Sequence, residues 1–236
     1  MARYARGFDT DAAGRHLARV DRPLGAWTRR IGPLPADTRW RQPFDPVDAL
    51  ARAILYQQLH AKAAATIVGR VELAIGSARL HVGTLSSIDD ATLRACGVSG
   101  NKALALRDLS RREVEGAIPT LRRMSHMTDD AIIDALVPIR GIGRWTVEMM
   151  LIFRLGRPDV FPVDDLGIRK GAQVVDGSDA LPSPRALRER GERWGPWRTQ
   201  ASLYLWRIAD AATQAAVAAK PGAAAARAAP VKRSQD

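Results

Sequence analysis

Apolar residues recur at helical spacing in several stretches of the chain, and each stretch is bounded by residues that begin or end helices. Asp45 followed by Pro46 predicts a helix start, and apolar side chains follow at intervals of three and four over residues 47–55. The same signals predict helices over residues 61–75, 87–97, 99–116, 128–136, 144–155, 165–174, from 183 onward and over 199–217. Period-two alternation of β-branched residues is absent over any useful length, so the pattern predicts an all-α fold.

Length and composition are those of a globular protein. The chain has 236 residues, of which 46% are hydrophobic, enough for one large core or two small lobes. No apolar run approaches the roughly 18 residues that a membrane span needs, and the N-terminus lacks the apolar segment of a signal peptide. We therefore expect a cytoplasmic protein without membrane contact. Cys96 is the only cysteine, which excludes an internal disulfide and a cysteine-ligated zinc or iron–sulfur site; we interpret it as a small apolar residue near a helix end.

The charge balance adds a partner class to this picture. Lysine and arginine total 36 against 25 acidic residues, a formal net charge of +11. A basic excess of this size favours a polyanionic partner, DNA or RNA first, although a genome rich in arginine codons would also produce it. Residues 215–236 consist mainly of Ala, Lys, Arg and Pro, which predicts a flexible basic tail that is either a solvated terminus or a weak attractor of phosphate.

The most specific local motif is a glycine-containing turn between two predicted helices, over residues 136–146. Gly141 and Gly143 permit positive φ and a close approach of the backbone to another molecule. Amides that begin the second helix have no intrahelical partner, and the helix dipole adds positive charge there, a combination that binds phosphate. We expect Ile139 and Ile142 to anchor the turn in the core. A lone Gly-x-Gly is also typical of an ordinary tight turn, but the flanking helices and the basic charge favour DNA binding.

Two adjacent carboxylates, Asp164 and Asp165, follow Phe161-Pro162-Val163 at a predicted loop-to-helix junction. An aspartate is a good N-cap, and one such residue is enough to cap a helix. We expect Asp164 to cap the helix that begins at Asp165, while the other carboxylate projects into a cleft.

Two motifs together resemble those of the helix–hairpin–helix (HhH-GPD) DNA glycosylase superfamily. They are the turn, Leu-x-x-Ile-x-Gly-Ile-Gly-Arg-Trp-Thr, and the segment Phe-Pro-Val-Asp-Asp about twenty residues later. Within this superfamily the chain is similar to the DNA-3-methyladenine glycosylase II (AlkA-like) branch. Residues 53–59, 93–103 and 194–206 resemble further segments of that branch, in the family's order, so that the similarity spans about residues 16–210. The resemblance implies an all-α, two-lobed module over residues 1–214 with a central cleft, without the N-terminal β domain of some AlkA-like enzymes.

The resemblance also implies a reaction. Bifunctional members of the superfamily carry a lysine after Gly-Ile-Gly-Arg, where this chain has Trp145. We therefore expect a monofunctional enzyme that flips an alkylated purine (3-methyladenine or 7-methylguanine) out of duplex DNA and hydrolyses its N-glycosidic bond in base excision repair. Asp165 is the implied catalytic carboxylate, which stabilises the oxocarbenium-like sugar and orients or deprotonates the attacking water.

Further site residues follow from the same resemblance. Trp145, Trp206 and Tyr56 would form an aromatic pocket for the cationic base, although either tryptophan could instead be a core residue. Trp194 and Trp197 are interpreted as structural packing. The wedge into the duplex would be Gln57 and Gln58, polar residues inside an otherwise apolar helix, with Gln58 filling the vacated space; the alternative is a hydrogen-bonding role within the protein. The expected DNA contacts are Gly141, Ile142, Gly143, Arg144 and Lys170.

No cofactor is expected for the chemistry. The resemblance implies a sodium or potassium ion at the turn, held by the backbone carbonyls of Val137, Ile139 and Ile142 and bridging to a DNA phosphate. We expect a monomer that acts on double-stranded DNA and associates with the nucleoid when bound.

Three alternatives stay open at this point. One is a non-catalytic DNA-binding module that kept the hairpin, and another is a glycosylase for a different lesion, such as hypoxanthine or a mispaired pyrimidine. A helix-turn-helix regulator is the third, and no separate dimerisation segment supports it.

Overall fold

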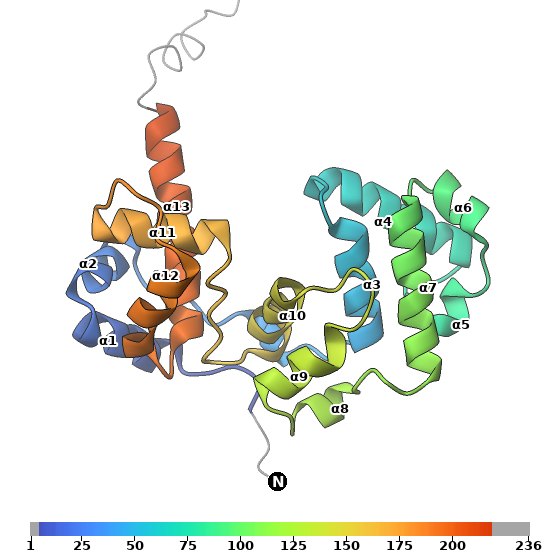
Figure 1. The fold of residues 1–236 in the computed structure, drawn as a ribbon, viewed down its shortest axis with the longest axis horizontal. Coiled ribbons are helices and arrows are strands. Elements are labelled where there is room, and N and C mark those ends of the chain that lie inside the picture. Colours follow the sequence, from blue (N-terminus) through green and yellow to red (C-terminus); the bar gives the residue numbers. More distant parts are fainter. Residues whose placement is uncertain (1–4, 219–236) are drawn as a thin grey trace, which may run out of the picture. The chain divides into compact units, whose positions relative to one another are not determined.

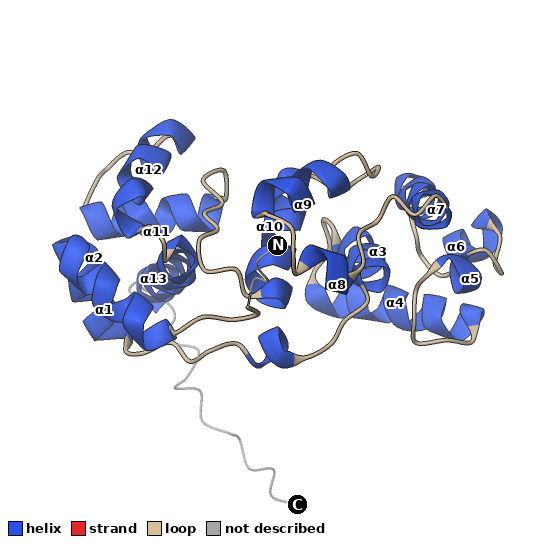
Figure 2. Cartoon of the chain, turned by 90° about the horizontal axis from the view of Figure 1, so that it is seen from below, coloured by secondary structure: helices blue, strands red, loops and turns tan. Residues whose placement is uncertain are grey.

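The computed structural model describes residues 5–218, and within that range no β-strand occurs, so the predicted all-α fold is confirmed (Figure 2). The elements are α1 (Thr10–Val20), α2 (Arg22–Ile31), the 3₁₀ turn η1 (Thr38–Arg41), α3 (Pro46–Tyr56), α4 (Ala61–Ile75), α5 (Val82–Leu85), α6 (Asp90–Ala95), α7 (Gly100–Val114), α8 (Leu121–Met124), α9 (Asp129–Leu136), α10 (Arg144–Met150), the π-helical turn η2 (Leu151–Leu155), α11 (Leu166–Asp176), α12 (Pro184–Gly191), the 3₁₀ turn η3 (Glu192–Trp194) and α13 (Arg198–Ala218).

The chain forms two compact units, and each is discontinuous in sequence (Figure 1). Unit 1 comprises Met1–Phe8 and Ala36–Val160, and unit 2 comprises Asp9–Pro35 and Phe161–Asp236. Of the predicted basic tail over residues 215–236, the first four residues continue α13, whereas residues 219–236 lie outside the described part of the chain.

Unit 1 is closed by its N-terminal segment. The guanidinium of Arg6 donates hydrogen bonds to the backbone carbonyls of Gln42 and Arg154 at 2.7 and 2.8 Å. The indole of Trp40 packs against the Phe8 ring and donates from Nε1 to the Ile152 carbonyl at 2.7 Å. These contacts join residues 6–8 and Trp40 to η2, and thereby fix one wall of the cavity described below.

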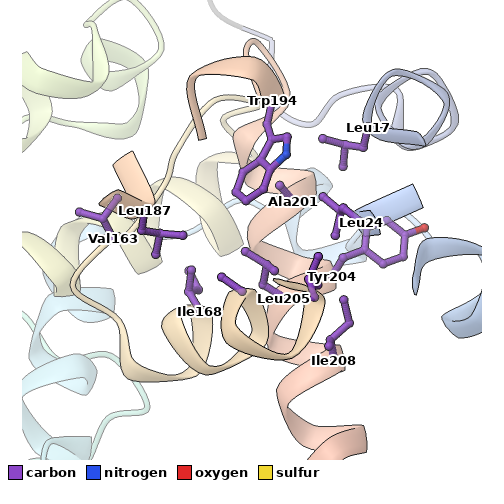
Figure 3. Close-up of a cluster of buried hydrophobic side chains, with 12 residues drawn as sticks. Leu17, Leu24, Val163, Ile168, Leu187, Trp194, Ala201, Tyr204, Leu205 and Ile208 are labelled. Atoms are coloured by element: carbon purple, nitrogen blue, oxygen red, sulfur yellow. The ribbon is translucent and has the colours of Figure 1, made fainter. Parts of the chain in front are cut away.

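Unit 2 is built around the packing of α11 on α13. Its core consists of the buried side chains of Leu17, Leu24, Val163, Ile168, Ala172, Val175, Leu187, Trp194, Ala201, Tyr204, Leu205 and Ile208 (Figure 3). The two helices approach closely at Gly171, where an added Cβ would lie 2.1 Å from the Leu205 carbonyl oxygen. Trp194 is fully buried and donates from Nε1 to Asp21 at 3.0 Å, which confirms its structural interpretation.

Most predicted helix boundaries agree with the structure. Asp45, Ser99, Thr128 and Ser183 are N-caps, and Gly76 and Gly156 end helices in the left-handed conformation. Cys96 is buried at the end of α6, as expected.

Several boundaries differ from the prediction. The helix expected from Ser87 begins only after Asp89, whose side chain accepts the Thr92 amide. The stretch 144–155 changes from α to π at Leu151. The sequence pattern also missed α1, α2, α5 and α8; α5 and α8 have four residues each, too few for an apolar period to register.

Candidate active site

The predicted turn joins α9 to α10 in unit 1. Ile139 and Ile142 are 1% and 4% exposed, which confirms that they anchor the turn in the core. Gly141 has φ +78, a left-handed conformation that favours glycine. Gly143 does not use this freedom, since it has φ −94 and ψ 167 and is the extended N-cap of α10. No side chain caps this helix start, because glycine has none to offer.

Three side-chain hydrogen bonds hold the turn from outside. Gln57 donates from Nε2 to the Gly141 carbonyl at 2.7 Å, and Arg112 donates to the Pro138 carbonyl at 2.7 Å. Asp108 on α7 accepts the amide of Arg140 at 2.9 Å. The turn is therefore preorganised by groups that lie 26 to 84 residues away in the sequence.

Of the residues that hold the turn, Asp108 is surrounded by charged groups. Burial works to raise the pKa of Asp108, but the Arg140 amide and the guanidinium groups of Arg111 and Arg112 outweigh it and lower the pKa to about 2. Arg111 and Arg112 lie 2.6 and 3.0 Å from its carboxylate oxygens. The carboxylate therefore stays ionised wherever the protein is folded at ordinary pH.

The glutamine pair lies in a loop, which corrects the prediction that it is inside a helix. The α3 helix ends at Tyr56, and Gln57 is its C-cap, with φ −55 and ψ 135. Gln58 is exposed and has φ +56, the one non-glycine residue with positive φ in the part of the chain that the structure describes. Lys102 on α7 satisfies a carbonyl at the C-terminal end of α3, because its Nζ donates to the Leu55 carbonyl at 2.7 Å. Burial lowers the pKa of Lys102.

A cavity of about 870 Å³ opens beside this loop, entirely within unit 1. Tyr56 and Trp145 line it and are 41% and 49% exposed, so neither is a core residue. The other aromatic and sulfur-containing walls come from Met149, Met150 and Phe153. Its lining also includes Gln57 and Gln58, which places the predicted wedge and two of the predicted pocket residues together.

Sequence reasoning missed Arg39, which also lines this cavity. Its guanidinium stacks over the Phe153 ring, 4.7 Å from the centroid, and donates from Nε to both oxygens of Asp37 at 2.9 and 3.0 Å. The hydrogen bond from Arg39 lowers the pKa of Asp37. No spacing in the sequence signals this contact, because η1 and η2 meet only through tertiary packing.

Asp165 lies in unit 2, as the N-cap of α11. Its Oδ1 accepts the backbone amide of Ile168 at 2.9 Å and the Nε1–H of Trp206 at 2.8 Å. The prediction that Asp164 caps this helix is wrong. Asp164 is exposed, and Asp165 caps the helix, which begins at Leu166. One half-buried carboxylate is thus oriented by a backbone donor and an indole donor on the same oxygen.

Gly167 makes the contact between Trp206 and Asp165 possible. An added Cβ there would lie 2.8 Å from Cδ1 of Trp206 and 3.1 Å from Oδ1 of Asp165. Any larger residue would push the indole away from the carboxylate. Sequence reasoning missed this glycine, and the only signal for it was its place directly after the two aspartates.

The predicted cationic contacts lie on different elements. Arg144, in the first turn of α10, is 59% exposed at its side chain and pairs with Glu148 at 3.1 Å. Lys170 is exposed on α11 in unit 2. The structure thus gathers Tyr56, Gln58 and Trp145 in unit 1, and Asp165 with Trp206 in unit 2.

Residues 5–218 contain no group of three His, Cys, Asp or Glu side chains arranged to hold a metal ion. They also include no helix long and apolar enough to cross a membrane. At the turn, the Ile139 carbonyl accepts the Ile142 amide at 3.0 Å, whereas the carbonyls of Val137 and Ile142 accept no hydrogen bond from the described residues. Carbonyl oxygens of this kind are suitable ligands for a hard cation.

Comparison with known proteins identifies the family. A model of the HhH-GPD superfamily of base excision DNA repair proteins matches residues 51–196, which include the turn, Trp145 and Asp165. The chain belongs to this superfamily. It is 36% identical to DNA-3-methyladenine glycosylase 1 of Schizosaccharomyces pombe over 169 residues, which cover 71% of this chain and 74% of the relative.

Two solved structures of the superfamily share the fold and more than 30% of the sequence. One is the S. pombe 3-methyladenine DNA glycosylase in complex with abasic DNA, with a TM-score of 0.73, 34% identity and coverage of 83% of this chain and 95% of that chain. The other is the DNA-3-methyladenine glycosidase of Bacillus halodurans, with a TM-score of 0.78, 32% identity and coverage of 88% and 94%. The chain is therefore a glycosylase of the HhH-GPD superfamily, in the AlkA-like branch that the sequence indicated.

Proposed function

We propose that this chain is a monofunctional DNA glycosylase that hydrolyses the N-glycosidic bond of 3-methyladenine and 7-methylguanine in double-stranded DNA. The observation that carries the proposal is the oriented carboxylate of Asp165, which accepts two hydrogen bonds on one oxygen and follows the glycine turn in the sequence. The names of the relatives supply the substrate class.

The turn binds the DNA backbone. Gly143, the N-cap of α10, offers no side chain to the amides of the first turn, and a helix N-terminus carries partial positive charge that attracts phosphate without reading sequence. The bonds from Gln57, Asp108 and Arg112 fix the turn before DNA arrives, so that little ordering is needed on binding. Arg144 and Lys170 add charge near the phosphates. A monovalent cation held by the carbonyls of Val137 and Ile142 would neutralise part of the phosphate charge.

Gln58 is the residue that enters the duplex when the damaged nucleotide leaves it. Its left-handed backbone costs about 1–2 kcal/mol for a residue with a side chain, and such strain is often retained at functional sites. The loop conformation presents an exposed amide at the mouth of the aromatic cavity. An amide there can replace the hydrogen bonds that the flipped base gives up. Gln57, by contrast, donates its side-chain hydrogen bond to the Gly141 carbonyl and positions the turn.

The aromatic cavity selects the base by its charge. A 3-methyladenine or 7-methylguanine ring is cationic, and each good contact with an aromatic face is worth about 0.5–2 kcal/mol. Trp145 and Tyr56 offer such faces because both are exposed in the cavity. Trp206 contributes through its hydrogen bond to Asp165.

The reaction breaks the bond between C1′ of the sugar and the base nitrogen, and the base departs with the electron pair. Ionised Asp165 stabilises the positive charge that develops on the sugar. Water then adds to C1′ and gives its proton to a base, the role that we propose for the same carboxylate. Trp145 takes the position of the lysine that would attack the sugar in a bifunctional enzyme, so the product is an intact abasic strand.

The proposal is tested by incubating the protein with a duplex that contains 7-methylguanine or 3-methyladenine and measuring free base by chromatography. We expect base release, and strand breaks only after alkali treatment. Strand breaks without alkali would refute the monofunctional mechanism. No release from any lesion duplex would favour the non-catalytic module. Parallel duplexes with hypoxanthine and with a mispaired pyrimidine test the alternative lesion classes.

A further inference from the structure

A second large cavity lies in unit 1, at the end of α3 that is opposite to the glutamine pair. It measures about 700 Å³ and is lined by the N-terminus of α3 and the C-terminal end of α7, whereas Gln57 and Gln58 follow the C-terminus of α3. The other end of α7, at Ser99 and Lys102, lines a separate cavity with Gln58 and Gly141. Because α3 has 11 residues, about 16 Å of helix separates this cavity from Gln58. The turn is nearer, since it contacts α7 at Asp108 and Arg112, within two helical turns of Glu113 in the cavity wall.

The cavity combines an apolar floor with a basic rim. Its floor includes Phe44 and the buried Ile118 and Pro119. Its rim carries the exposed side chains of Arg79, Arg122 and Arg123. None of these three guanidinium groups forms an ion pair or hydrogen bond within residues 5–218.

The two carboxylates that line the cavity are engaged in capping helices and support its walls. Asp45 accepts the amide of Val47 at 2.8 Å, and Glu113 accepts the amide of Val82 at 2.6 Å. Neither makes an ion pair with the rim arginines. The cavity is therefore a positively charged concavity whose charge is not balanced by close ion pairs.

The backbone around the cavity is fixed. Thr120 caps α8 by accepting the amide of Arg123 at 3.2 Å, and the Arg79 carbonyl accepts the Thr84 hydroxyl at 2.8 Å. The Phe44 ring is flanked by the guanidinium groups of Arg6 and Arg154, at 5.5 and 5.1 Å from its centroid. A ligand would meet a preformed surface, which reduces the entropic cost of binding.

We propose that this cavity, the Arg79–Arg122–Arg123 pocket, docks a segment of a protein partner in which acidic residues flank a large apolar side chain. The carboxylates would pair with the rim arginines, and the apolar side chain would cover Phe44 and Ile118. Arginine and aromatic side chains are enriched in protein interfaces, and clusters of arginines recognise acidic motifs. Duplex DNA fits less well, since its backbone has phosphates but no apolar side chain for the floor.

The proposal does not depend on the identity of the lesion or on Asp165. Its test uses the full chain and a fluorescein-labelled peptide, Glu-Asp-Leu-Phe-Glu-Asp, with binding followed by fluorescence polarisation. A second peptide carries Ser-Ser in place of Leu-Phe, and an unmodified 20-base-pair duplex is titrated separately. The test variant is Arg79→Ala/Arg122→Ala/Arg123→Ala. The matched control is Arg70→Ala/Arg94→Ala/Arg188→Ala, which removes the same charge from exposed arginines outside the pocket that have no ion pair in the described chain.

We expect saturable binding of the Leu-Phe peptide with a Kd below about 1 mM, weakened about tenfold by the test variant and less than about twofold by the control. The Ser-Ser peptide should bind several-fold more weakly, while duplex affinity and base release should be equal in the two triple variants. Absence of saturable peptide binding to the wild type would overturn the proposal. So would equal weakening by both variants, which indicates net charge alone, or a selective loss of duplex binding in the test variant, which assigns the pocket to DNA.

Discussion

Replacing Trp206 with phenylalanine removes one hydrogen bond from Asp165 and keeps an aromatic ring in the same place. The bond joins Nε1 to Oδ1 at 2.8 Å, and a hydrogen bond to a charged group contributes about 1.5–3 kcal/mol. Trp206 is half-buried rather than fully buried, so we expect the lower end of that range. Loss of about 1.5 kcal/mol of orientation and charge stabilisation in the transition state corresponds to a rate about tenfold lower.

The assay is single-turnover release of 7-methylguanine at saturating enzyme, with DNA affinity measured separately by polarisation. We expect Trp206→Phe to lower the release rate with little change in affinity, because the ring is retained. Gly167→Ala should act in the same direction, since its Cβ would displace the indole. Trp27→Phe, at a half-buried tryptophan of the same unit, is the control and should keep the wild-type rate. A wild-type rate for Trp206→Phe, or a loss confined to affinity, would refute the positioning role.

Three further changes test the supports of the fold and the site. Because the pKa of Asp108 is lowered to about 2 from its ordinary 3.8, its contribution to stability is present above pH 4 and is lost as the pH falls through 2. Asp108→Asn should therefore lower the free energy of unfolding in urea by about 1–2 kcal/mol at pH 7, and by progressively less from pH 4 to pH 2. A loss of stability that does not change with pH would contradict this. Gln58→Gly should not lower Tm, because glycine adopts φ +56 without strain, yet it should slow base release; a lower Tm with normal release would count against the wedge role. Gly171→Ala should destabilise the protein by about 3 kcal/mol, because the added Cβ would clash with Leu205. Gly14→Ala, whose added Cβ would lie in open space, should stabilise the protein slightly. Similar effects of the two substitutions would show that the α11–α13 contact relaxes.

The parts of the fold that could be predicted from sequence depend on local chemistry. The α9–α10 turn was predictable because its capping residue, its glycines and its apolar anchors all lie within about twenty residues. The start of α3 was predictable for the same reason, since Asp45 and Pro46 are both strong helix-start signals. Two aromatic residues that line the cavity, Tyr56 and Trp145, were found by resemblance to the family.

The errors come from contacts that are distant in the sequence. Nothing near Tyr56 marks a helix end, because neither glycine nor proline follows; α3 ends where Gln57 bonds a carbonyl 84 residues away and Lys102 takes the Leu55 carbonyl. Local spacing could not show which of the two adjacent aspartates caps α11 either. The indole that helps to select Asp165 comes from a residue 41 positions further along the chain.

The central claim, that Asp165 carries the reaction, is tested most directly by comparing Asp165→Asn with Asp164→Asn. Asparagine is also a good N-cap, so the first variant retains α11 and removes the negative charge, which unfolding curves can verify. Single-turnover release of 7-methylguanine should fall at least about a hundredfold in Asp165→Asn and stay at the wild-type rate in Asp164→Asn. Equal release by folded Asp165→Asn and wild type would contradict the assignment.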